Sequence, residues 1–235
     1  MPAPAPTVLA IDAAGSDCGA AVAAGDKLLA IANAAMLHGQ AEALLPMIDD
    51  VVREAGLTPS GLDLVAVTTG PGSFTGIRMG IAAARGIALA RDLSLVGVSC
   101  FEAVAASVPD TAIEGRHLLV ALDSRRADLY VQLFDGFARP LLEPAAMHPE
   151  TLANAVFWVE RKIIVVAGDG AARAVQVLAK SGEATIVETA PPVAGALRAA
   201  IWKWRRGEGD GAVRPLYLRP PAVSFPGGQG SSSAS

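Results

Sequence analysis

The chain has 235 residues, of which 52% are hydrophobic, 18% charged and 5% aromatic. This composition excludes a disordered chain, which combines low hydrophobicity with high charge. The apolar content is mostly alanine, valine, leucine and isoleucine, which suits α/β packing. The formal net charge of −4 argues against a stand-alone nucleic-acid binder, because affinity for phosphates needs a basic surface.

Nothing in the sequence indicates a secreted or membrane protein. No basic residues precede the apolar start of the chain, as they would in a signal peptide, and no run of about 18 apolar residues is uninterrupted. The two cysteines, Cys18 and Cys100, lie far apart and have no ligand or redox spacing. We therefore expect a cytoplasmic protein, without membrane contact, in which both thiols are buried in a reducing environment.

The first half of the chain predicts three strands followed by alternating helices and strands. A buried strand at 8–12 ends in Asp12, and a hairpin turn at Gly25 joins strands at 18–24 and 27–33. The later elements are a helix at 40–55, a strand at 64–68, a helix at 75–90, a strand at 95–98 and a helix at 101–107.

The second half predicts the same order of elements. The strand at 118–123 also ends in an aspartate, Asp123. The expected elements after it are strands at 128–134 and 139–142, a helix at 149–156, a strand at 163–167, a helix up to 180, a strand at 185–188 and a helix at 193–206. These elements predict two βββαβα units with mixed sheets, one subdomain at 1–107 and a second at 108–218. A flexible tail is expected at 219–235.

Candidate phosphate-binding residues lie in the turns after two predicted strands. A strand that ends in aspartate and a small turn, as at Asp12, is how actin-like ATPases and sugar kinases begin, although such an aspartate often only shapes a turn. The turn after Asp123 has two arginines and no glycine, so it is a poorer phosphate turn. Asp169, in the turn 168–170, marks either an adenosine site or a helix cap.

The glycine-rich turn before the 75–90 helix is the sharpest of these segments. Free amides at a helix N-terminus can cradle an anion, so Gly72, Ser73 and Arg78 are candidate nucleotide contacts together with Asp12. The alternative is a tight turn in which Ser73 or Thr75 caps the helix. No lysine follows as in a P-loop. Three isolated histidines, at 38, 117 and 148, predict no metal site.

The helix at 75–90 is apolar on both sides. Ile77, Gly80, Ile81, Ala84, Ile87 and Ala88 share the face that should pack on the sheet. The opposite side presents Met79, Ala82, Ala83 and Gly86, where a monomer should be polar. We expect this side to bind a partner, together with Met47 and Val51 of the helix at 40–55. The alternative is that the 40–55 helix itself covers it.

Five segments together resemble the TsaB (YeaZ) family: VLAID at 8–12, HGQAEALLPMI at 38–48, GPGSFTGIRMG at 70–80, GVSCFEA at 97–103 and RPLYLR at 214–219. An older classification calls this family M22 glycoprotease-like. The resemblance implies an actin-like ASKHA (ribonuclease H-like) fold. It also implies a place in the bacterial machinery that installs threonylcarbamoyl-adenosine next to the anticodon of tRNAs reading codons that begin with A.

The resemblance further implies a scaffold that has no catalytic residues and binds the transferase TsaD, with the ATPase TsaE as a second partner. Some members form homodimers when free. ATP and metal would be bound by the partner subunits, and tRNA would be reached only through the complex. The histidine pair with which TsaD binds its metal is absent, so a peptidase role is disfavoured. The competing hypothesis is an ASKHA small-molecule kinase or ATPase that uses Asp12 and Asp123 with magnesium.

Overall fold

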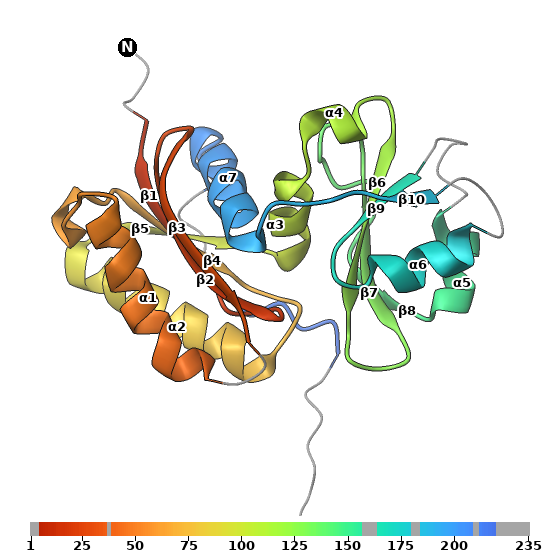
Figure 1. Cartoon of the computed structure of the whole chain (residues 1–235), viewed down its shortest axis with the longest axis horizontal. Coiled ribbons are helices and arrows are strands. Elements are labelled where there is room, and N and C mark those ends of the chain that lie inside the picture. Colours follow the sequence, from red (N-terminus) through yellow and green to blue (C-terminus); the bar gives the residue numbers. More distant parts are fainter. Residues whose placement is uncertain (1–4, 37–38, 157–163, 180–183, 209–211, 220–235) are drawn as a thin grey trace, which may run out of the picture.

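The structure is a computed structural model that describes residues 5–36, 39–156, 164–179, 184–208 and 212–219. Two five-stranded mixed sheets form its framework (Figure 1). The first has the order β3 (Lys27–Ala35), β2 (Asp17–Ala24), β1 (Thr7–Asp12), β4 (Leu64–Thr68) and β5 (Ser94–Val98). The second has the order β10 (Ala184–Ile186), β9 (Ile164–Ala167), β6 (His117–Asp123), β7 (Leu129–Phe134) and β8 (Ala145–Met147).

The two sheets share one topology. In the first sheet β1 pairs antiparallel with β2 and parallel with β4, and in the second sheet β6 pairs antiparallel with β7 and parallel with β9. Within β1, residues 8–11 are fully buried, because helices cover both faces of the first sheet; this is why the strand is a continuous apolar run. The predicted α/β class with two tandem mixed sheets is confirmed.

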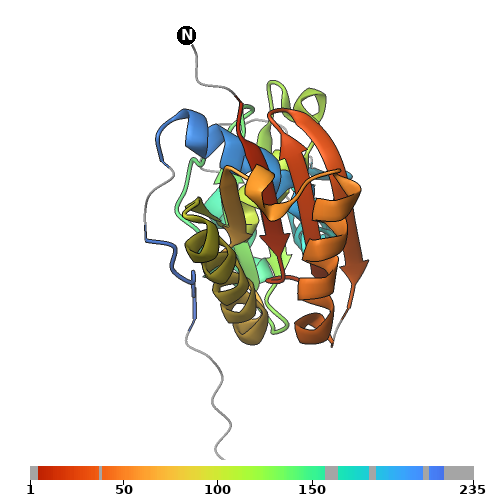
Figure 2. The ribbon, with the colours of Figure 1, turned by 90° about the vertical axis from the view of Figure 1, so that its left-hand side faces the viewer.

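Helices cover the outer face of each sheet and fill the space between the two sheets. On the outer face of the first sheet lie α1 (Gln40–Glu54) and α2 (Phe74–Arg91), which Figure 2 shows side by side in front of the strands. Between the sheets lie α3 (Cys100–Ser107) and α7 (Pro192–Arg205), and the outer face of the second sheet carries α5 (Pro149–Val156) and α6 (Ala171–Leu178) (Figure 1). A 3-10 turn (Pro59–Gly61) and the short α4 (Asp110–Ile113) complete the elements.

The expected strand at 139–142 is wrong, and β8 begins three residues after it. Pro140 has no N–H to donate, and it makes only one isolated bridge, to Phe134. The carboxylate of Asp135 accepts hydrogen bonds from the amides of Phe137 and Arg139, which fixes a turn there. The regular pairing with β7 starts only after this turn, at Ala145.

The predicted boundary at 108–218 implied that the last helix completes the second half, but it does not. α7 packs on α3 and on the first sheet, where Val193, Ala196, Leu197 and Ala200 join a core with β1 and β4. The chain therefore returns to the first lobe for its last helix. Within that helix Lys203 pairs with Glu102 of α3 at 2.7 Å, so the basic end of α7 is docked in the protein. The predicted tail lies outside the described residues except for Arg219.

Candidate functional site

A cavity of about 580 Å³ lies between the two lobes. Its wall includes the carboxyl ends of β1, β4 and β6, which is where ligands bind in open α/β sheets. The charged side chains in the wall are Asp12, Asp17, Asp123, Arg125, Asp169 and Glu188. The structure thus brings together the three aspartates that the sequence singled out.

Asp12 is almost wholly buried at the end of β1, with 3% of its surface exposed. Its Oδ1 accepts hydrogen bonds from the Thr68 hydroxyl at 2.6 Å and from the amide of Ala14 at 3.1 Å. Burial raises the pKa of this carboxyl above its ordinary value of 3.8, although both hydrogen bonds lower it. Asp12 is therefore held rigidly by its own lobe.

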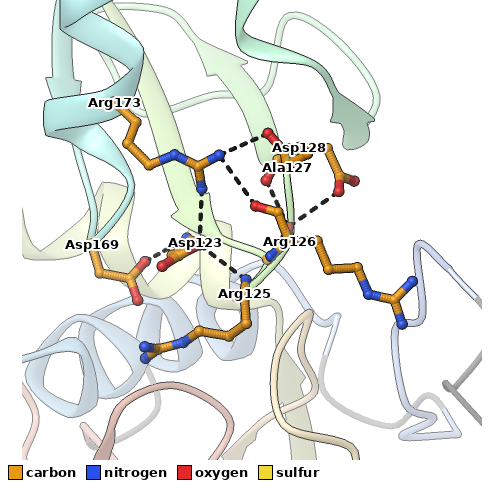
Figure 3. A network of polar contacts seen from close by, with 8 residues as sticks. Asp123, Arg125, Arg126, Ala127, Asp128, Asp169 and Arg173 are labelled. Atoms are coloured by element: carbon orange, nitrogen blue, oxygen red, sulfur yellow. Dashed lines mark hydrogen bonds and ion pairs between the residues drawn. The ribbon is translucent and has the colours of Figure 1, made fainter. Parts of the chain in front are cut away.

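The carboxylate of Asp123 is engaged on the opposite wall. Its Oδ1 accepts from the amide of Arg125 at 2.9 Å and from Arg173 of α6 at 3.1 Å (Figure 3). The same guanidinium donates to the carbonyls of Arg126 and Ala127. Arg173 thus neutralises Asp123 and stiffens the turn after β6, a contact that the sequence gives no sign of.

Asp169 does not cap a helix, which was one of the two interpretations of its turn. The N-cap of α6 is Gly170, and no side chain caps that end. The Oδ1 of Asp169 instead accepts from the amide of Asp123 at 2.8 Å, linking β9 to the end of β6 (Figure 3). Burial raises the pKa of Asp169. The side chain of Asp169 lies at the cavity wall.

The glycine-rich turn uses its amides within the protein. The amide of Ser73 donates to the carbonyl of Ala14 at 2.7 Å, and the amide of Gly76 donates to the Ser73 hydroxyl, which caps α2. A Cβ at Gly72 would lie 1.9 Å from the oxygen of Ala14, so this glycine allows two loops to touch. Gly72 and Ser73 line the cavity, but the tight-turn interpretation describes them better than an anion cradle.

Arg78 does not line the cavity, although the sequence grouped it with the nucleotide contacts. Its guanidinium lies 3.7 Å from the centre of the Phe74 ring, and its Nε donates to the Tyr217 hydroxyl at 3.2 Å. The rings of Phe74 and Tyr217 stack at 5.3 Å. Arg78 therefore attaches the segment at 213–219 to α2.

The outward face of α2 is apolar and exposed. Ala82 and Gly86 are exposed, Met79 and Ala83 are half-buried, and no atom lies within 4 Å of a Cβ built at Gly86. Leu89 is 87% exposed on the same helix. Of the predicted sheet-facing side, Ile77, Gly80, Ile81, Ala84 and Ala88 are buried, whereas Ile87 is half-buried.

The neighbouring helix contributes less than expected to that surface. Met47 is half-buried beside α2, but Val51 is fully buried in the core and presents no surface to a partner. Leu45 is 60% exposed, but it lies two residues from Met47, which places it on the opposite flank of α1. We call the exposed and half-buried apolar residues Met47, Met79, Ala82, Ala83, Gly86 and Leu89 the outer helix face.

Metal ligands do not gather in the described part of the chain, where no three His, Cys, Asp or Glu side chains could hold an ion together. His38 lies outside that part. Both cysteines are buried and free, and burial raises the pKa of each thiol. No described helix is long and apolar enough to cross a membrane.

Comparisons with known proteins match this chain to TsaD and TsaB proteins. The family model of TsaD, tRNA N6-adenosine threonylcarbamoyltransferase, matches residues 33–189. The tRNA threonylcarbamoyladenosine biosynthesis protein TsaB of Haemophilus influenzae is 32% identical over 125 residues, which are 53% of this chain and 52% of that protein. The chain therefore spans about half the length of this curated relative in the match.

Solved structures extend the similarity over nearly the whole fold. YeaZ from Pseudomonas aeruginosa superposes with a TM-score of 0.77 at 28% identity, covering 91% of this chain and 100% of its own. A ROK hexokinase from Thermus thermophilus reaches a TM-score of 0.52 at 15% identity over 86% of this chain and 99% of its own, which shows a shared fold alone.

Proposed function

This chain belongs to the TsaB (YeaZ) family of TsaD-like proteins, and on that premise we propose that it is a scaffold subunit in tRNA threonylcarbamoyladenosine synthesis. In this proposal it binds the transferase TsaD and activates it without carrying out chemistry itself. TsaE is the second protein of the complex, and tRNA is contacted through the complex rather than by this acidic chain alone.

The outer helix face is the observation that carries the proposal. An exposed leucine at 87% beside exposed Ala82 and Gly86 is costly in water, and small residues let a second helix approach closely. The TsaD family model matches this chain, so we expect TsaD to have the same fold and an equivalent helix pair. Two such pairs can pack as a four-helix bundle, and a second copy of this chain would use the same face when TsaD is absent.

The polar groups of the cavity support a scaffold over a kinase. Asp123, which the kinase hypothesis requires as a free carboxylate, is paired with Arg173. The Ser73 and Gly76 amides, which would hold a phosphate, are used inside the protein. We therefore propose that ATP and metal act in the partner subunits.

The test is co-purification with TsaD of the same organism, followed by threonylcarbamoylation of tRNA in vitro. Ala82→Arg places a charge in the centre of the outer helix face, and we expect it to weaken TsaD binding about 100-fold, because the interface would bury an unpaired charge. Ala179→Arg, the same change at an exposed position at the end of α6, is the matched control and should leave binding unchanged.

Retained co-elution of the Ala82→Arg variant with TsaD would contradict the proposed interface. ATP turnover by the isolated chain, abolished by Asp12→Asn, would favour the kinase hypothesis instead. Circular dichroism of both arginine variants verifies that the fold is unchanged.

A further inference from the structure

The cavity between the lobes has no part in the proposed scaffold role. None of the outer helix face lines it, and its wall comes from the ends of the central strands together with α3, α7 and the turns around them. Its volume of about 580 Å³ lies within the range of sites for small organic ligands, about 300–1,000 Å³. A ligand of this cavity must match the chemistry of its wall.

Asp12 supplies a hydrogen-bond acceptor without a protein partner. Both of its hydrogen bonds, from Thr68 and Ala14, go to Oδ1, and among the described residues none reaches Oδ2. The residue is 97% buried, since only 3% of its surface is exposed, and it lines the cavity. The Oδ2 atom is not among the unpartnered polar atoms that are cut off from solvent, so it opens on the cavity, where a donor group of a ligand would replace water.

The charge of the wall selects a positive donor. Five carboxylates line the cavity against one guanidinium, that of Arg125, and within the described residues Asp123 alone among them forms an ion pair, with Arg173. Helix N-termini at the wall add partial positive charge: Ser73 caps α2 and a capping box closes α3, but α6 and α7 begin there with no side-chain cap. At roughly +0.5 each, these ends together with Arg125 remain below the charge of the five carboxylates. An anionic ligand such as a nucleotide would meet repulsion from Asp12, Asp17, Asp169 and Glu188.

The wall also has an apolar part, which includes Ala103, Val104, Leu122 and Val187. A bare metal ion would leave this surface unused, and no three ligand side chains converge among the described residues. We propose that the cavity binds a small organic cation, a protonated amine with an apolar body, whose ammonium group donates a hydrogen bond to Oδ2 of Asp12. Burial raises the pKa of both Asp12 and Asp169, and at Asp169 the nearby Arg125 opposes this shift.

Three ligands of nearly equal shape test the charge requirement on the isolated full-length chain: phenethylamine, the neutral 2-phenylethanol and the anionic 3-phenylpropionate. We expect phenethylamine to bind in the millimolar range, as its size allows, and at least about tenfold more tightly than the alcohol. 3-Phenylpropionate should not bind measurably. Titrations followed by NMR chemical shifts at constant ionic strength measure all three.

Two variants locate the ligand. Asp12→Asn keeps an oxygen for Thr68 and Ala14 and should reduce phenethylamine binding to the level of the alcohol. Asp169→Asn likewise keeps an oxygen for the Asp123 amide and should weaken binding in part; it is the second test if the first variant does not fold. Asp49→Asn, an exposed acid on α1, should bind like the wild type and controls for net charge.

Equal affinity for the amine and the alcohol, or amine binding that survives both cavity variants, would overturn the proposal. Binding of ATP with magnesium that Asp12→Asn abolishes would also overturn it, in favour of a nucleotide site. These measurements need no TsaD. They therefore stand or fall independently of the proposed scaffold function, which the Ala82→Arg variant tests.

Discussion

The carboxyl group of Asp12 ends a buried strand in the first sheet, and its burial decides how it titrates. Hydrogen bonds from Thr68 and Ala14 favour the charged form, but loss of hydration favours the neutral form more strongly. A raised pKa means that the folded chain holds the Asp12 proton more tightly than the unfolded chain does. Asp12 therefore lowers stability at neutral pH, a cost that is typical of functional positions.

We predict that Asp12→Asn raises the melting temperature at pH 7. Between the ordinary pKa of 3.8 and the raised folded value, the folded chain binds more protons than the unfolded chain, so stability falls as pH rises through this window. The variant escapes this loss, and Tm should rise by about 2–4 °C for each kcal/mol recovered. At pH 3, where both states are protonated, the difference should vanish.

Calorimetry at both pH values, with Asp49→Asn as a control for removing one charge, checks this prediction. A lower Tm for Asp12→Asn than for the wild type at pH 7 would contradict it, since it would mean that the charged carboxylate stabilises the fold.

The glycine-rich turn shows where residue-scale prediction ends. Its position before a helix and its serine cap could be predicted from local sequence, and both are confirmed. The contact between Gly72 and Ala14 could not be predicted, because the two residues are far apart in the chain and no local rule pairs them. The same holds for Arg173, whose bond to Asp123 depends on how α6 sits against β6.

At the scale of elements, apolar patterning predicted most helices and strands to within two or three residues. Periodicity shows that a helix buries one face, but it does not show against which sheet, and so α7 was assigned to the second lobe although it packs on the first. The misplaced strand at 139–142 has a local cause, since Pro140 interrupts a stretch that is otherwise apolar.

The docking of α7 on α3 depends on one glycine. A Cβ at Gly195 would lie 1.8 Å from the oxygen of Ala103, so Gly195→Ala must push the helices apart. We predict a loss of about 2–4 kcal/mol in the free energy of unfolding, measured by urea denaturation. Gly86→Ala on the open face of α2 is the matched control and should gain up to about 1 kcal/mol from helix propensity.

Equal effects of the two alanines would show that α7 does not pack closely on α3. In that case α7 would be held in the first lobe by its contacts with the sheet alone.

At the scale of the whole molecule, the segment at 213–219 ties the lobes together. The carbonyl of Val213 accepts a hydrogen bond from Arg85 of α2 at 2.6 Å, and the amide of Leu216 donates to Thr69 after β4 at 2.8 Å. Beyond these contacts with the first lobe, Arg219 pairs with Asp128 of the second lobe at 2.9 Å. A stretch of seven residues thus contacts both lobes.

The ion pair between Arg219 and Asp128 should contribute to the free energy of unfolding, because the Asp128 side chain is only 6% exposed, whereas that of Arg219 is 44% exposed. Removing Arg219 leaves a buried carboxylate without its cation. We predict that Arg219→Ala costs about 1–2 kcal/mol, less than the 3–5 kcal/mol of a fully buried pair, because water already reaches the guanidinium.

A double-mutant cycle separates this effect from lost packing. Asp128→Asn removes the charge that needs a partner, so Arg219→Ala should cost much less in that background, and the coupling should fall as salt rises. If Arg219→Ala cost the same in both backgrounds, the segment would be held by its contacts with α2 and β4 alone. The two lobes would then meet only through their shared core.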